Sequence, residues 1–447
     1  MTTTVRPPGL FSPQYLWTTI GANALVFLGA FEALAVTTIM PTISRDLDGE
    51  ALYSVAFSGT LASSVIGMVV AGRWADKRGP VRPLIAAIAV FLVGLILSGV
   101  AWNMEVFLSG RILQGLGTGA INVALYVVVA RIYPAALHPK IFGAFAAAWV
   151  IPSLIGPPVA GLVADASSWH WVFLGVGALV LAASASIVPS LRELMGHTTE
   201  PVESKASAWT IAWAVVVAVG VLAISLAGEY WPIAIVAFVI VIVAVRPLLP
   251  RGTLLVRRGL PATVLLRGAI AATFFAAEIY LPYMLNTKYG LPTWASGLIL
   301  TVGALSWAGG SAVQGRIGER MPHASVARLG AVLLAIGIAA QFLTAFFTLS
   351  LFVAAAGWFV AGAGMGLLFP RISTLVLGYS TPRDQGFNSA AMSITDATGG
   401  ATAIAFAGLL FTAFGGIEGN GFAAALALTA GIALLVLPVA FRVREGS

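Results

Sequence analysis

The chain has 447 residues, of which 59% are hydrophobic and only 9% are charged, and its formal net charge is +7. Soluble domains carry about 25% charged residues, so this composition excludes a soluble globular protein and predicts an all-α polytopic membrane protein. The absence of cysteine excludes disulfides and thiolate metal ligands, and four scattered histidines predict no metal centre.

Apolar runs of the length that a bilayer requires, about 20 residues, recur along the whole chain. The seventh and eighth runs are separated only by Glu229–Tyr230 and predict a transmembrane hairpin, with a hairpin lying on the membrane surface as the alternative. We therefore predict fourteen membrane-spanning helices, over residues 16–41, 52–74, 82–102, 104–131, 140–164, 170–190, 208–228, 231–249, 262–287, 292–316, 325–347, 350–378, 386–414 and 420–441.

The basic residues predict the orientation of these helices. With the N-terminus in the cytoplasm, 21 of the 24 Lys and Arg residues fall on the cytoplasmic side, Arg45 and Lys288 fall outside, and Arg111 lies within the membrane. Such a bias follows the positive-inside rule. We expect a multi-pass protein of the cell (cytoplasmic) membrane with both termini in the cytoplasm. The positive net charge is then explained by the basic residues on the cytoplasmic side, and no nucleic-acid partner is predicted.

The two ends of the chain repeat each other. The sequence GRWADK at 72–77 reappears as GRIGER at 315–320, and Gly143 and Gly156 reappear as Gly386 and Gly399, all with a shift of 243 residues. Internal repeats of this kind are typical of secondary transporters. We predict an N-terminal six-helix bundle over 1–195, a linker with the inserted hairpin over 196–260, and a C-terminal six-helix bundle over 261–447.

The loop GRWADKRGPVRPL at 72–84 combines glycines, an acid and several basic residues. It resembles the cytoplasmic loop motif of the major facilitator superfamily, G-x-L-A-D-R-x-G-R-K-x-x-L, although Pro80 and Val81 replace two basic residues. In that family the loop latches the two halves of the transporter, and the alternative is a solvated loop that serves topology alone. The resemblance assigns this conformational role to Gly72, Asp76, Lys77, Arg78 and Gly79.

The stretch GRILQGLGTGA at 110–120 places an arginine in an apolar run, which costs about 2.5–3.5 kcal/mol at a helix centre. It resembles the family motif R-x-x-Q-G-x-G through Arg111, Gln114, Gly115 and Gly117. The glycines permit close approach of helices. Arg111 must face inward, in either a functional or a purely structural role.

Two further motifs resemble those of exporters. PSLIGPPVAG at 152–161 is similar to the antiporter motif G-x-x-x-G-P-x-x-G-G at Gly156, Pro157 and Gly161, with a generic proline kink as the alternative. FEALAVTTIMP at 31–41 is similar to a run in fourteen-helix drug exporters and places Glu32 on its acidic position. The resemblance implies the major facilitator fold, two pseudo-symmetric six-helix bundles plus a two-helix central insertion, in the drug:proton antiporter branch.

Three carboxylates are expected well inside the membrane, and such groups are functional candidates by default. Helix lengths place Glu32 and Arg111 at similar depths, and in the family fold their helices line the central cavity, so we expect the two to approach. A nearby cation favours the ionised carboxylate and burial favours the neutral one, which suits proton exchange. Glu278 is expected to bind a cationic substrate or a second proton, or simply to pack. Asp396 is a further candidate for proton coupling. We expect Thr395 and Thr398 to satisfy it locally, and its helix to give it a conformational role, with direct contact to the substrate as the alternative.

The substrate cavity is expected to be apolar and aromatic, as small-molecule sites generally are. The candidates for its lining, besides Glu32 and Glu278, are Tyr126, Trp149, Phe275, Tyr280, Trp307 and Trp358. Trp358 takes the position of Arg111 when the two halves are aligned on their glycines.

The sequence has no phosphate-binding loop G-x-x-x-x-G-K-[ST], so an ion gradient is expected to supply the energy. The favoured hypothesis is a monomeric, proton-coupled secondary transporter that exports small amphipathic organic compounds by alternating access, without a cofactor. Sodium coupling, and a lipid or metabolite transporter of the same fold, are the alternatives. An enzyme or channel is disfavoured, because no nucleophile is paired with a base.

Overall fold

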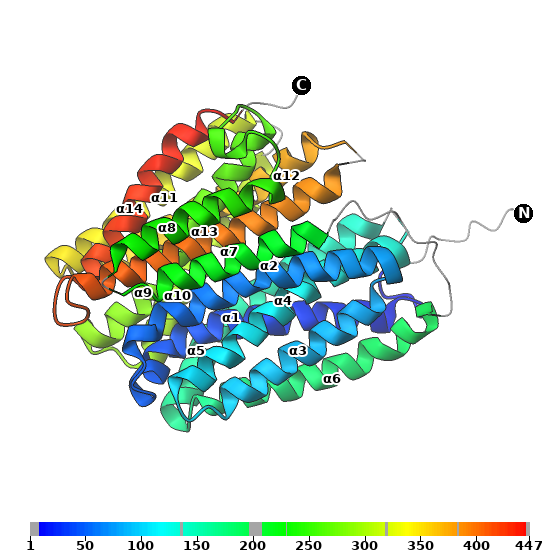
Figure 1. Cartoon of the computed structure of the whole chain (residues 1–447), viewed down its shortest axis with the longest axis horizontal. Helices are drawn as coiled ribbons and strands as arrows, with labels where there is room; N and C mark the ends of the chain where they lie inside the picture. Colours follow the sequence, from blue (N-terminus) through cyan, green and yellow to red (C-terminus); the bar gives the residue numbers. More distant parts are fainter. Residues whose placement is uncertain are drawn as a thin grey trace, which may run out of the picture.

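The structure is a computed structural model that describes residues 9–134, 137–195, 208–228, 230–317, 321–381 and 384–443. The turn residue Glu229 and the repeat residues Gly318, Glu319 and Arg320 lie outside the described residues. Fourteen α-helices make up its main framework (Figure 1). They are α1 Leu16–Asp46, α2 Tyr53–Arg78, α3 Val81–Gly99, α4 Met104–Ile132, α5 His138–Ala166, α6 His170–Met195, α7 Ala208–Ser225, α8 Trp231–Val245, α9 Leu260–Tyr289, α10 Thr293–Ile317, α11 His323–Phe347, α12 Leu351–Gly378, α13 Gln385–Ala413 and α14 Gly421–Ala440.

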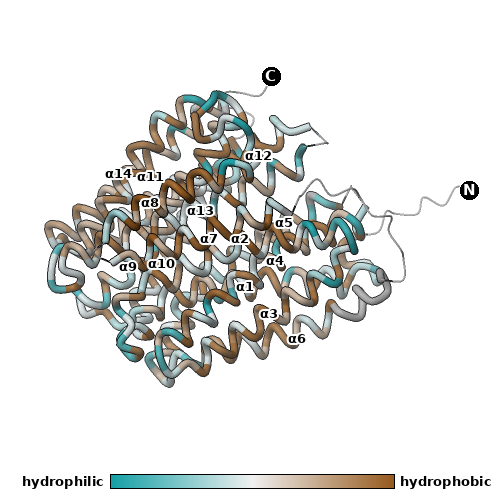
Figure 2. Tube along the Cα trace, viewed as in Figure 1, coloured by the Kyte–Doolittle hydropathy of each residue, from teal (hydrophilic) through white to brown (hydrophobic). Residues whose placement is uncertain are grey.

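The predicted helices are confirmed, with differences at their ends. Helix α1 continues through Pro41 to Asp46, five residues beyond the predicted end. Within the described residues, thirteen helices are long and apolar enough to cross a membrane, and the apolar segment Trp209–Ser225 of α7 is shorter than these. Apolar residues dominate the middle of the helices in Figure 2, as a bilayer requires.

The two halves repeat the same helix pairings. In the N-terminal half α4 packs against α2 and α3, and α1 packs against α5. In the C-terminal half α12 packs against α10 and α11, and α9 packs against α13. The inserted hairpin of α7 and α8 lies between the halves in Figure 1, beside α2 and α13. Two like six-helix bundles with a central two-helix insertion are therefore confirmed.

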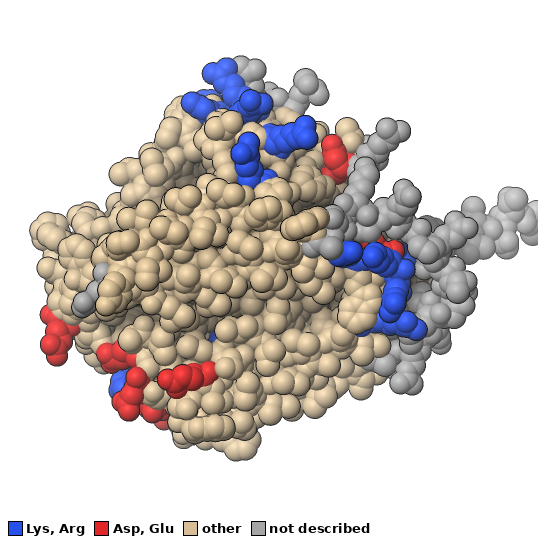
Figure 3. Space-filling view, in the orientation of Figure 1, with Lys and Arg blue, Asp and Glu red and all other residues tan. Residues whose placement is uncertain are grey.

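The charged side chains gather at opposite ends of the molecule (Figure 3). We call the end that carries Arg73, Lys77, Arg78, Arg82 and Arg131 the basic end. We call the opposite end, which carries the exposed Asp46, Asp48, Glu50, Glu105, Asp165 and Glu418, the acidic end. The wide middle of the surface is uncharged in this view, in keeping with a lipid-facing belt.

Glycines let α4 lie directly on its neighbours. A Cβ atom at Gly115 would come within 2.1 Å of the Thr60 carbonyl oxygen of α2, and one at Gly119 within 2.1 Å of the Ser64 carbonyl oxygen. Gly117 faces Phe91 of α3 in the same way. Close backbone packing of this kind holds membrane helices together, and it fixes the position of Arg111 one turn away.

The halves meet near the acidic end. Tyr53 on α2 donates a 2.7 Å hydrogen bond to the Ile279 carbonyl on α9, and the hydroxyls of Thr42 and Thr293 lie 3.2 Å apart. The helix 5 motif forms part of this contact, because a Cβ atom at Gly161 would lie 2.6 Å from the Trp294 backbone of α10. These contacts join the two bundles on that side of the membrane.

Candidate functional site

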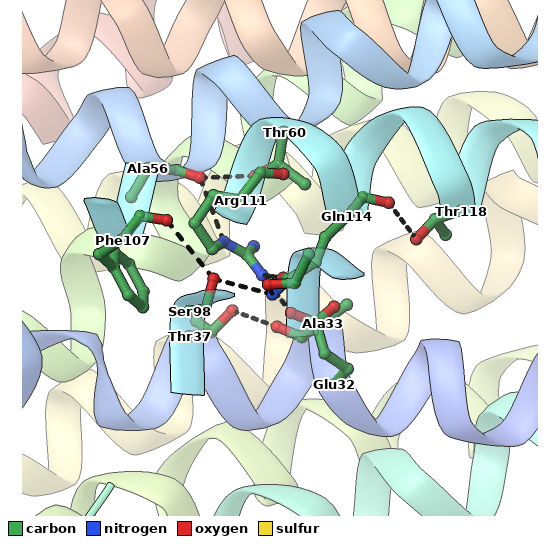
Figure 4. Close-up of polar contacts among 11 residues, drawn as sticks. Glu32, Ala33, Thr37, Ala56, Thr60, Ser98, Phe107, Arg111, Gln114 and Thr118 are labelled. Carbon is green, nitrogen blue, oxygen red and sulfur yellow. Dashed lines mark hydrogen bonds and ion pairs between the residues drawn. The ribbon is translucent and has the colours of Figure 1, made fainter. Parts of the chain in front are cut away.

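A buried ion pair joins α1 and α4 (Figure 4). The Glu32 carboxylate accepts a hydrogen bond from Nη1 of Arg111, and the two residues are only 4% and 3% exposed. The same nitrogen donates to Oε1 of Gln114, and Nε donates to the Ala56 carbonyl of α2 at 3.4 Å. The structure thus brings together the two charged residues that the sequence placed at similar depth.

Gln114 connects this ion pair to α3 through hydrogen bonds. Its amide nitrogen donates to the Gly94 carbonyl at 3.1 Å and to the Ser98 hydroxyl at 3.0 Å, both on α3. These bonds turn the amide oxygen toward Arg111. Residues of α1, α2 and α4 therefore bind the guanidinium directly, and α3 supports it through Gln114.

A second ion pair, between the buried Arg267 and the partly buried Asp396, corrects the expectation for Asp396. Its carboxylate accepts from Nε of Arg267 on α9 at 2.7 and 2.8 Å, whereas the expected local partners serve other roles. Thr395 donates to backbone carbonyls of its own helix, and the Thr398 hydroxyl has no hydrogen-bond partner. Arg267 also donates at 3.0 Å to the Phe369 carbonyl and to the Ser373 hydroxyl, and so ties α9 to α12 and α13.

Two further basic residues are buried among the helices. Arg267 and Arg371 are 5% and 2% exposed in α9 and α12. Sequence reasoning missed Arg267 as a site residue. The available signal was its position seven residues into an apolar helix, a setting like that of Arg111.

Glu278 differs from the other two intramembrane carboxylates. It lies partly buried on α9, and within the described part of the chain the structure gives it no hydrogen bond and no ion pair. The neighbouring Ile279 carbonyl accepts the Tyr53 hydroxyl. Glu278 is thus a carboxylate without a protein cation, beside the contact between the halves.

The aromatic candidates for the cavity lining occupy three kinds of position. Trp358 and Tyr280 are 1% exposed, the former stacked on Phe274 with ring centroids 4.5 Å apart. Phe275 and Trp307 are partly buried, whereas Tyr126 and Trp149 are 55% and 47% exposed. Trp149 borders a recess that it shares with Leu25, Val26, Phe91, Thr118 and Asn122. In this conformation the six aromatics do not form one surface.

The loop motif turns sharply between α2 and α3. Gly79 has a φ angle of +78°, a left-handed value that favours glycine, and α3 begins at Val81. Arg131 of α4 donates a 3.2 Å hydrogen bond to the Ala75 carbonyl beside it, and Lys77 and Arg78 are exposed. Gly72 and Asp76 lie in the last two turns of α2 and are partly buried. In α5, a Cβ atom at Gly156 would lie 3.5 Å from the ring of Phe31 on α1, the residue before Glu32.

Comparison with known proteins identifies relatives among transporters. A family model described as Major Facilitator Superfamily matches residues 22–357. Multidrug transporter protein MdtP of Bacillus subtilis is 26% identical over 420 residues, which are 89% of this chain and 75% of that protein. Multidrug efflux pump SdrM of Staphylococcus aureus is 28% identical over 156 residues, 35% of each protein. The chain aligns with only 25–28% of the length of several other curated relatives. Among them is the MFS-type transporter sphD of Aspergillus fumigatus, 35% identical over 167 residues, which are 35% of this chain.

Solved structures share the fold at low sequence identity. A POT family transporter in complex with 5-aminolevulinic acid has a TM-score of 0.69 at 14% identity, covering 95% of this chain and 94% of that one. A bacterial homologue of the human lysosomal transporter Spinster has a TM-score of 0.65 at 15% identity, covering 96% of both chains. The family model spans most of the sequence, and the helices form two like bundles around an inserted hairpin. The chain belongs to the major facilitator superfamily of transporters.

Proposed function

We propose that the protein is a proton-coupled antiporter that exports amphipathic or lipophilic organic compounds by alternating access. The observation that carries the proposal is the Glu32–Arg111 ion pair, a carboxylate and a guanidinium buried together inside the N-terminal bundle. Buried charges of this kind in membrane proteins mark ion pathways and proton relays. Two relatives, one named a multidrug efflux pump and the other a multidrug transporter protein, support the substrate class.

The network gives the proton a mechanical effect. When Glu32 is ionised, its bond to Arg111 ties α1 to α4. Protonation removes the negative charge and weakens this tie, while Arg111 keeps its bonds to Gln114 and to the Ala56 carbonyl. The guanidinium therefore stays solvated by the protein in both states, and the freed α1 can move relative to α4. Proton uptake and release then bias the two conformations of the transporter.

The C-terminal half supplies the complementary charge in this proposal. Among the residues that the structure describes, no cation pairs with Glu278, unlike Glu32 and Asp396, and this carboxylate is therefore free to attract a cationic substrate. Substrate charge and proton are thus assigned to different halves. The Arg267–Asp396 pair, which joins α9 to α13, is assigned to holding the C-terminal bundle as it rocks.

The proposal is tested in proteoliposomes by following uptake of ethidium, a lipophilic cation, under an imposed pH gradient. We expect gradient-driven uptake by the wild type and its loss in Glu32→Gln, because the amide cannot exchange a proton. The matched control is Glu105→Gln, which removes an exposed carboxylate at the acidic end of α4 and is expected to leave uptake unchanged.

Two outcomes would contradict the proposal. Gradient-driven uptake that persists in Glu32→Gln would show that Glu32 does not carry the coupled proton. Glu278 and Asp396 would then remain as candidates for the proton-coupling residue. Absence of ethidium movement under any gradient in the wild type would reject drug export, and a specific metabolite or a lipid would replace it as the substrate class.

A further inference from the structure

The two halves meet along two lipid-facing seams that differ in how well they are covered. One seam lies between α2 and α13, and the other lies between α5 and α10. In the most apolar stretches of α2 and α13, 61% and 72% of the residues are buried, against 28% in both α5 and α10. In the peripheral helices α3 and α6, the buried fractions of the corresponding stretches are 50% and 39%. Helices α5 and α10 are therefore much less covered by protein than the helices of the other seam.

The α5–α10 seam is closed in one half of the membrane and parted in the other. Toward the acidic end, Gly161 lies against Trp294, Pro157 lies against Gly297, and the Leu154 carbonyl accepts the Thr301 hydroxyl at 3.2 Å. On the same face of α5, at helical spacings of three or four residues toward the basic end, lie Val150, Ala147 and Gly143. All three are exposed. The matching stripe of α10 leads to Leu305, Gly309 and Ala312, also exposed.

The inserted hairpin covers the α2–α13 seam. Helix α7 packs against both α2 and α13, and Figure 1 shows α8, α13, α7 and α2 running side by side. Ser58 of α2 and Ser225 of α7 share a hydrogen bond of 2.8 Å. Phe238 of α8 packs edge-on against Phe406 of α13, with ring centroids 5.3 Å apart. Residues 66–76 in the basic half of α2 include no exposed position.

The parted stretch lies at the depth of acyl chains. Leu154 is near the middle of α5, and Ala147 lies about 10 Å from it toward the basic end, within the roughly 15 Å that half a hydrocarbon core spans. The exposed side chains on both stripes are apolar or absent. Next to them on α5, Trp149 borders the recess whose polar members are Thr118 and Asn122. The recess lies about one helical turn from Glu32, since Gly29 and Ala30 also line it.

We propose that the α5–α10 seam is the portal through which lipophilic substrates pass from one leaflet into the transporter, and that the α7–α8 hairpin closes the opposite seam. This inference rests on the proposed function and adds the route of the substrate. The occupant is a small amphipathic organic molecule dissolved in the leaflet at the basic end. It passes Val150 and Leu305, and Trp149 receives its apolar part beside the recess.

The portal is tested by obstruction. The protein is placed in nanodiscs that contain anionic lipid, and the association and dissociation rates of ethidium are measured from its fluorescence. In Ala147→Trp and Leu305→Trp we expect both rates to fall about tenfold while Kd changes less than about twofold, because a blocked route slows entry and exit alike. The matched control Ala178→Trp adds the same bulk to an exposed position of α6 and leaves both rates unchanged.

The outcomes separate the portal from the proposed function. Unchanged rates in both seam variants, with the wild type binding ethidium, would overturn the portal and leave export intact. A changed Kd with an unchanged association rate would overturn it too, because the substitutions would then act on the bound state. If the wild type binds ethidium but does not move it with a pH gradient, proton-coupled export is rejected. The association and dissociation rates of the two seam variants then still test whether the portal exists. Absence of ethidium binding to the wild type would reject both.

Discussion

At the scale of single residues, Arg111 is held by more partners than its charge requires. Glu32 supplies the counter-charge, Gln114 and the Ala56 carbonyl supply further acceptors, and Thr60 bonds to the backbone of Arg111 itself at 3.2 Å. Removing one member of a buried pair leaves the other charge uncompensated, whereas removing both is often tolerated. The pair therefore contributes to structural specificity as well as to its proposed role in coupling.

This reasoning predicts a non-additive effect on stability. Arg111→Leu is expected to destabilise the fold by about 3–5 kcal/mol, because the Glu32 carboxylate stays buried without a cation. The double variant Glu32→Gln/Arg111→Leu is expected to recover most of this loss. The measurement is the apparent melting temperature in detergent micelles, followed by tryptophan fluorescence, with Glu105→Gln as the control. If the double variant melts as low as the sum of the two single effects, the pair does not act as a unit.

At the scale of helices, the sequence determines where each helix begins and ends better than it determines what each face contacts. A bilayer requires about 20 apolar residues per span, so the runs and their breaks locate α1–α14 to within a few residues. The Glu32–Arg111 contact was predictable because both residues could be placed by depth on helices that the family fold brings together. Arg267 and Asp396 are 129 residues apart, and their pairing depends on the register of α9 against α13. The aromatic residues sit on helices that are apolar all round, so their exposure could not be read from periodicity.

The glycines of α4 illustrate the same limit and give a test. The motif predicted close approach, and the structure identifies the partner: a Cβ atom at Gly119 would lie 2.1 Å from the Ser64 carbonyl oxygen of α2. Gly119→Ala is therefore expected to push α4 away from α2 and to cost about 1–3 kcal/mol, the usual range for overpacking. The control is Gly175→Ala on α6, where an added Cβ meets nothing within 4 Å. Equal melting temperatures for the two variants in micelles would contradict this packing.

At the scale of the whole molecule, charge and packing are both polarised along the membrane normal. The acidic end carries the contacts between the halves, among them Tyr53 with Ile279 and Trp294 with Asp165 at 3.2 Å. The α5–α10 seam parts toward the basic end, as the exposure of Ala147 shows. If the positive-inside rule sets the orientation, the parted side faces the cytoplasm, where an exporter must collect its substrate. Orientation therefore links the proposed direction of transport to the conformation of the structure.

The absence of cysteine from the chain makes this orientation directly measurable. A single cysteine is introduced as Glu50→Cys at the acidic end or as Arg82→Cys at the basic end, both at exposed positions. We expect a membrane-impermeant maleimide to label Glu50→Cys in intact cells and Arg82→Cys only after the cells are permeabilised. The parent protein provides the blank, since it has no thiol. The reverse pattern would place the parted seam in the outer leaflet, and the structure would then represent the state that releases an exported substrate or collects an imported one.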